Sequence, residues 1–80
     1  MSDLKQILSN IAKAIVDNPD EVAVLQTEED DDTVNLELHV APDDMGKVIG
    51  RHGRIANSIR AVMKAAATAG GIKINVEIRD

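Results

Sequence analysis

Hydrophobic residues recur along the first part of the chain at the spacing of an amphipathic helix. From Leu4 to Ile15 the apolar positions lie three or four residues apart, with polar residues between them. Ser2 is a candidate N-cap, and Asn18–Pro19 is a stop signal because proline disfavours helical backbone in the residue before it. The pattern therefore predicts a helix from about Asp3 to Asp17.

Three later stretches alternate apolar and polar residues and predict strands. The first begins at Val22 and runs into the acidic residues Glu28–Asp32, whose like charges cannot pack together and so predict a solvated turn. The second, Val34 to Val40, alternates with strict period two, as expected for a half-buried strand. The third, Ile72 to Ile78, repeats that pattern near the end of the chain.

Two further helices are predicted between the second and third strands. Pro42 ends the second strand, and Asp43 or Asp44 can cap a short helix that follows it. A longer helix runs from about Arg54 to Ala69 and ends at Gly70–Gly71. Its predicted apolar face consists of Ile55, Ile59, Val62, Met63 and Ala66.

The predicted order of elements is α-β-β-α-α-β in a single domain that spans residues 1–80. The first two strands are joined by a short turn and should pair antiparallel. The crossover through two helices is long enough for the second and third strands to pair in parallel, with the usual right-handed sense. We therefore expect an α+β two-layer domain in which three helices cover one face of a three-stranded mixed sheet.

Composition limits the possible chemistry. The chain has no cysteine, which removes disulfides and thiolate metal sites, and its two histidines, His39 and His52, are too few for a metal cage. His39 falls on the polar face of its strand, where we expect it to be exposed. No serine, histidine and carboxylate constellation specifies an enzyme, and no cofactor or small-molecule substrate is expected. Without a targeting signal or a membrane-length apolar run, we expect a cytoplasmic protein.

The net charge of -5 hides a strong asymmetry along the chain. Up to Asp44 there are 12 acidic and 2 basic residues, whereas from Met45 onward there are 7 basic and 2 acidic residues. This polarity lets a basic surface face a phosphate chain while an acidic surface maintains solubility. Ordinary surface patterning would account for the asymmetry equally well.

The candidate site is the turn Gly50-Arg51-His52-Gly53 between the two later helices. Two glycines three residues apart allow a tight reversal and leave no Cβ to hold off the backbone of a ligand. The turn leads into a helix N-terminus, which favours anionic groups, and Lys47, Arg51 and Arg54 add positive charge there. A phosphodiester backbone fits these features, although a helix-turn-helix corner would also need glycine for geometry alone.

This stretch and its setting resemble a known family. Val48–Ile49 precede the first glycine, Ile55 follows the second, and the turn joins two helices within the order α-β-β-α-α-β. The chain resembles K-homology (KH) domains of the type II topology, whose signature has the form V-I-G-x-x-G. In size and layout it is similar to the stand-alone bacterial KH proteins of the KhpA-like family. The resemblance covers nearly the whole chain and implies a type II KH fold.

The resemblance also implies roles for individual residues. Residues 50–53 match the loop that clamps about four nucleotides of single-stranded RNA by their backbone. Ile49 matches an apolar position that lines the base groove, and Lys73 on the third strand falls in the opposite wall. Lys73 is equally well explained as an exposed strand residue, and His52 as an exposed loop residue. Because the chain has no aromatic residue on which bases can stack, we expect weak, salt-sensitive binding.

Relatives of this kind imply a wider role and partners. They form homodimers, pair with a larger KH-containing protein of the KhpB (Jag/EloR) type, and are implicated as RNA chaperones or post-transcriptional regulators that affect cell shape and cell wall growth. Ala61 and Ala65 lie off the main apolar stripe of the last helix, where small side chains would allow a second helix to approach closely. Alanine at an exposed site is also explained by its helix propensity alone.

Two alternatives to RNA binding through the loop remain open. In the first, the chain is an interaction module that docks the larger KH partner, and the partner makes most of the RNA contact. In the second, the groove accepts single-stranded DNA. The basic side chains of the turn favour the leading hypothesis, whereas the overall acidity favours the docking module.

Overall fold

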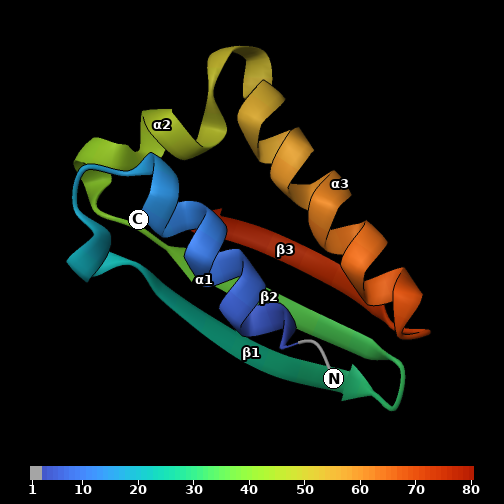
Figure 1. Cartoon of the computed structure of the whole chain (residues 1–80). Helices are drawn as coiled ribbons and strands as arrows, with labels where there is room; N and C mark the ends of the chain where they lie inside the picture. Colours follow the sequence, from blue (N-terminus) through green and yellow to red (C-terminus); the bar gives the residue numbers. More distant parts are fainter. Residues whose placement is uncertain (1–2) are drawn as a thin grey trace.

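The computed structural model describes residues 3–80 and has the predicted order of helices and strands (Figure 1). Single 3-10 turns at Pro19–Glu21, Pro42–Asp44 and Arg51–Gly53 join some of these elements. The helices and strands in chain order are α1 (Leu4–Ile15), β1 (Ala23–Asp30), β2 (Thr33–His39), α2 (Met45–Ile49), α3 (Arg54–Ala69) and β3 (Lys73–Arg79).

The three strands form a mixed sheet in the order β1-β2-β3. β1 pairs antiparallel with β2, with Val24 opposite Leu38. β2 pairs in parallel with β3, with Leu36 opposite Val76. The α+β prediction with a parallel crossover is therefore confirmed, and both β1 and β3 are edge strands.

The helices lie on one face of this sheet (Figure 1). α1 contacts β1 and β2, α3 contacts β3, and α2 packs against α1 and α3 at one end of the helical layer. Because side chains alternate along a strand, the even-numbered residues of β2 enter the core and the odd-numbered ones lie on the open face, whereas in β1 only Val24 is buried. Large side chains of the core include Leu8, Val34, Leu36, Leu38, Val48, Ile59 and Met63.

The N-terminus of α1 is capped by Asp3, whereas the sequence suggested Ser2. The side chain of Asp3 accepts a hydrogen bond from the amide of Gln6 at 3.2 Å, so Asp3 is the N-cap. This contact satisfies one of the amides that a helix leaves without an internal partner. Ser2 lies outside the described residues.

We expected Asp43 or Asp44 to cap α2, but the side chain of Asp44 makes no capping hydrogen bond to this helix. Its carboxylate accepts hydrogen bonds from the amide of Asp17 at 3.1 Å and from the amide and side chain of Asn18 at 3.0 Å each. Burial alone would raise the pKa of Asp44, but these hydrogen bonds and the charge of Lys47 lower it below the usual value. The carboxylate thus ties the segment after α1 to the start of α2 and fixes the helix that leads into the glycine turn.

The acidic run is only partly a turn. Glu28 to Asp30 continue β1, and the reversal is made by Asp31 and Asp32. The carboxylate of Asp30 accepts a hydrogen bond from the amide of Asp32 at 3.0 Å, and contacts with Asp32 lower the pKa of Asp30. β1 tolerates these charges because it is an edge strand whose end is exposed to solvent.

Candidate nucleic-acid interface

The first glycine of the turn is required by both backbone geometry and packing. Gly50 has φ 74° and ψ 176°, a region of conformational space that is essentially restricted to glycine. A β-carbon at this position would also lie 2.6 Å from Cγ1 of Ile55 on the first turn of α3. Any side chain at Gly50 would therefore displace the start of α3.

The second half of the turn leaves its backbone open to a ligand. His52 has φ 58° and Gly53 has φ 74°, so two successive residues adopt left-handed backbone. The amide of Gly53 donates to the carbonyl of Gly50 at 3.2 Å and closes the turn. A β-carbon on Gly53 would meet no atom within 4 Å, so another backbone has room to approach this position.

The turn is also the most accessible positive feature near the N-terminus of α3. Arg51, His52 and Arg54 are exposed, and within residues 3–80 neither arginine takes part in an ion pair. α3 contains 16 residues, and its first amides lie at the positive end of the helix dipole. Geometry and charge therefore combine at one point to favour an anionic chain.

The other predicted site residues lie at different distances from the turn. Ile49 is half-buried immediately before Gly50. The ammonium of Lys47 is 3.3 Å from a carboxylate oxygen of Asp17, so this residue is directed toward the end of α1 and is only partly available to a ligand. Lys73 begins β3 beside the C-terminal end of α3, about 24 Å along the helix from the turn. The structure does not bring Lys73 together with the loop.

Arg60 is a basic residue near the site that the sequence reasoning missed. It lies on α3 two helical turns after Gly53, and its Nε donates to the carbonyl oxygen of Val76 on β3 at 3.2 Å. The absence of acidic residues from Met45 to Val76 was the signal that could have directed attention to it.

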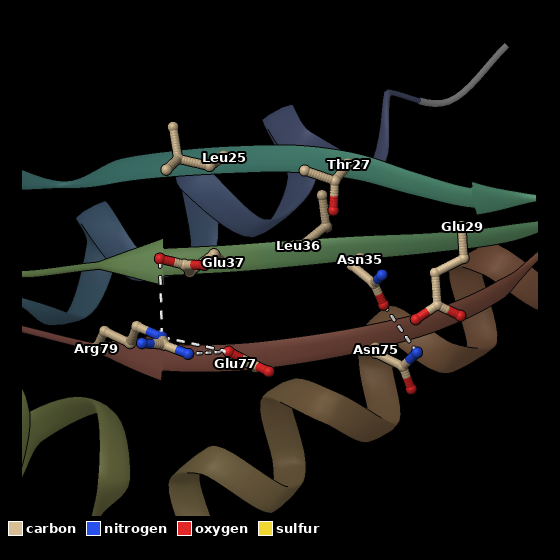
Figure 2. A pocket seen from close by; sticks show the side chains of 9 residues that line it. All are labelled: Leu25, Thr27, Glu29, Asn35, Leu36, Glu37, Asn75, Glu77 and Arg79. Atoms are coloured by element: carbon tan, nitrogen blue, oxygen red, sulfur yellow. Dashed lines mark hydrogen bonds and ion pairs between the residues drawn. The ribbon is translucent and has the colours of Figure 1, made fainter.

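The open face of the sheet carries a shallow pocket of a different character (Figure 2). Arg79 binds the carboxylate of Glu77 at 2.7 Å and lies 3.7 Å from that of Glu37, and these contacts raise the pKa of Arg79. Asn75 donates to Asn35 at 2.9 Å, as the dashed lines of Figure 2 show. With Glu29, Glu37 and Glu77 in its lining, this pocket has more negative than positive groups and repels a phosphate chain.

His39, which we expected to be exposed, is less accessible to solvent than predicted. Its side chain is half-buried on the open face, and Nε2 lies 2.6 Å from a carboxylate oxygen of Glu37. The alternation of β2 placed His39 on the correct face, but the neighbouring carboxylate two residues away could have been read from the same pattern.

An apolar hollow lies between α1 and α3, on the other side of α3 from β3. Ile55 and Val62, which we expected in the core, remain 37% and 51% exposed and line this hollow instead. The predicted helical face was rotated, because the buried positions of α3 are Ala56, Ile59, Met63 and Ala67. Ala61 and Ala65 are exposed on α3 but do not line this hollow.

The part of the chain that the structure describes holds neither a cluster of metal ligands nor a membrane-spanning helix. No group of three or more His, Asp or Glu side chains there is arranged to hold a metal ion. None of the described helices combines the length and the apolar character needed to cross a lipid bilayer.

An αββααβ domain with a G-x-x-G turn at the start of α3 and the free edge of a mixed sheet beside that helix is a type II KH domain. The family model described as "KhpA/KhpB, KH domain" matches residues 5–78, and the chain belongs to this family. Members of the family are non-enzymatic.

Several relatives match over nearly their whole length. RNA-binding protein KhpA of Clostridium acetobutylicum is 53% identical over 75 residues, which cover 94% of this chain and 99% of the relative. The protein of the same name from Clostridium perfringens is 48% identical over 75 residues, with the same coverage. RNA-binding protein KhpA of Aquifex aeolicus is 44% identical over 78 residues and 98% of each chain.

Proposed function

We propose that this chain is a non-catalytic protein that binds single-stranded RNA through the loop Gly50–Gly53. The observation that carries the proposal is the combination of an open backbone at Gly53 with the guanidinium groups of Arg51 and Arg54, which form no ion pair within residues 3–80. Relatives that align over nearly the full chain are named RNA-binding proteins, which supports the same conclusion.

In this proposal the phosphates lie against the turn and the first amides of α3. Arg51 and Arg54 supply charge, and His52 donates a hydrogen bond that strengthens when its ring is protonated. The bases extend from Ile49 toward β3, where aliphatic contacts and backbone hydrogen bonds hold them. Because no aromatic side chain is present for stacking, the affinity is low and depends on salt.

The wider role follows from family resemblance. We propose that the protein acts in the cytoplasm as an RNA chaperone or post-transcriptional regulator, with effects on cell shape and cell wall growth. A weak grip suits that role, because a chaperone must release its RNA after each encounter.

The test is a fluorescence-anisotropy titration of a ten-nucleotide RNA with wild type and the variant Arg51→Asp/His52→Asp. Aspartate tolerates the left-handed backbone at position 52, so the variant should fold. We expect binding to be lost in this variant. The matched control is Lys5→Asp/Asn10→Asp on the exposed face of α1, which changes the net charge equally and should bind almost as wild type. Equal weakening in both variants would show general repulsion and not a loop site.

A second function is supported by the hollow between α1 and α3. Ile11, Ile15, Ile55 and Val62 present apolar surface there, and Ala61 on the same helix permits close approach of another helix. We propose that a second copy of this chain docks on the hollow and Ala61–Ala65 to form a homodimer. A larger KhpB-type KH protein would use the same surface in a heterodimer, because the family model describes KH domains of both kinds.

A further inference from the structure

A polar row runs along α3 and consists of Asn57, Arg60 and Lys64, of which Arg60 contacts β3. They lie three and four residues from one another, so they share one face of the helix, and all three are exposed. The Nε of Arg60 donates to the carbonyl of Val76. We call the region between this row and the edge of β3 at Ile74–Val76 the α3–β3 strip.

Within residues 3–80, the outer edge of β3 in this strip offers backbone groups that no neighbouring strand pairs. The amide of Lys73 donates to Asp32, and the carbonyl of Arg79 accepts from Val40, so the odd-numbered residues of β3 direct their backbone groups toward β2. The even-numbered residues direct theirs outward, as the bond from Arg60 to Val76 shows. An edge strand of this kind presents donors and acceptors to a ligand.

The bond to Val76 uses one donor of Arg60 and leaves the outer end of the guanidinium free. Within residues 3–80 Arg60 takes part in no ion pair, so no carboxylate competes for that end. The backbone contact restricts the side chain before any ligand arrives, which reduces the entropy lost when a ligand binds. The result is a pair of parallel N–H donors held at the edge of the strip.

The strip lies within reach of an RNA held by the loop. Arg60 follows Gly53 by seven residues, which places it about 10 Å along the axis of α3. A KH loop holds about four nucleotides, so a base two or three positions from the clamped phosphate can reach the guanidinium.

We propose that Arg60 is a specificity-determining residue that selects bases with two adjacent hydrogen-bond acceptors. Guanine offers O6 and N7, and cytosine offers N3 and O2, whereas neither adenine nor uracil presents two adjacent acceptors on one edge. This inference rests on RNA binding at the loop. It adds a preference for guanine or cytosine over adenine and uracil at one position of the bound RNA.

The test compares wild type with Arg60→Lys, which keeps the charge but removes the planar pair of donors. The probes are ten-nucleotide oligouridine and the same chain with adenine, cytosine or guanine at every third position. We expect wild type to bind the guanine or the cytosine probe about five- to a hundred-fold more tightly than oligouridine. Arg60→Lys should lose this preference while its affinity for oligouridine stays within about two-fold.

Arg79→Lys on the open face is the matched control and should keep the preference, because its charge network lies away from the strip. If wild type binds all four probes equally, or Arg60→Lys keeps the preference, the inference about Arg60 is wrong while the loop proposal stands. If wild type binds none of the probes, RNA binding itself fails and the inference fails with it. Circular dichroism of each variant excludes unfolding as the cause.

Discussion

A β-carbon on Gly50 would lie 2.6 Å from Cγ1 of Ile55, far inside van der Waals contact. The start of the glycine turn and the first turn of α3 therefore touch directly. Because Ile55 also lines the hollow between α1 and α3, one side chain connects the proposed RNA loop with the proposed docking surface. This contact explains why the two glycines of the turn are not equivalent.

Gly50→Ala should destabilise the protein more than Gly53→Ala. At Gly50 the cost combines a backbone conformation that alanine disfavours, about 1–3 kcal/mol, with crowding of about 1–3 kcal/mol. At Gly53 the left-handed conformation alone costs about 1–2 kcal/mol, since its β-carbon meets no atom within 4 Å. Urea unfolding of both variants measures the difference.

Truncating the side chain of Ile55 should partly restore the stability that is lost in Gly50→Ala. Ile55→Ala deletes two of the three atoms that a β-carbon on Gly50 would approach, so it should recover about 1 kcal/mol in the Gly50→Ala background. If Gly53→Ala proves the more damaging of the two glycine substitutions, the assigned packing at Gly50 is incorrect.

Asp44 should make stability depend on pH. Its pKa is lower in the folded protein than in the unfolded chain, so the folded state favours the charged carboxylate. The stabilisation is fully present above the unfolded value of about 3.9 and is lost as the pH falls through the lower folded value. Asp44→Asn should therefore lower the unfolding midpoint at pH 7 and differ less from wild type in strong acid.

Asp43, the exposed neighbour of Asp44, provides the control for the measurement of stability against pH. Asp43→Asn should leave the midpoint at pH 7 almost unchanged, because no hydrogen bond to its side chain is seen within residues 3–80. A constant gap between wild type and Asp44→Asn down to pH 2 would mean that the charge of Asp44 does not contribute.

RNA binding should weaken as the salt concentration rises, and the steepness of this dependence reports the number of phosphate contacts. With about three contacts at the turn, log K should fall with log salt concentration with a slope of about -2, or about twenty-fold between 50 and 200 mM. Arg54→Gln should reduce the slope by about 0.7. An unchanged slope in this variant would remove Arg54 from the contact.

Val62→Asp should separate a homodimer that uses the hollow. Val62 is 51% exposed in the single chain, so the substitution leaves the fold intact but places a charge in the interface. The dissociation constant should rise by at least about a hundred-fold, as measured by sedimentation equilibrium. Leu25→Asp is the matched control, because Leu25 is 55% exposed on the open face of the sheet. A wild-type protein that stays monomeric at about 100 μM would rule out this dimer.

Most of the fold could be predicted from local patterns. Period-two alternation identified β2 and β3, and helical spacing with stop signals identified α1 and α3, because both depend on neighbours along the chain. The contact of Asp44 with Asn18 spans 26 residues, and no local pattern reports it. The rotation of the buried face of α3 was missed for a similar reason, since Ala56 and Ala67 lie on the buried face, where we had expected Ile55 and Val62.

The candidate site was predictable only in part. The spacing of the glycines identified the turn, because backbone geometry is encoded locally. The pairing of Lys47 with Asp17, the distance of Lys73 from the turn and the contact of Arg60 with Val76 all depend on how separate elements pack. The distribution of charge along the sequence indicated that residues 45–80 are basic. It did not indicate which of the basic side chains form ion pairs with other parts of the chain.

The measurement that tests the central claim most directly is an amide chemical-shift titration of ¹⁵N-labelled protein with ten-nucleotide oligouridine. The account predicts that the largest shifts occur at Gly50 to Ile55, with smaller shifts along Ile74 and Val76 at the edge of β3. Shifts concentrated on the open face of the sheet, at Asn35 or Asn75, would contradict the assignment of the loop. A titration to millimolar RNA with no shift anywhere would contradict RNA binding itself.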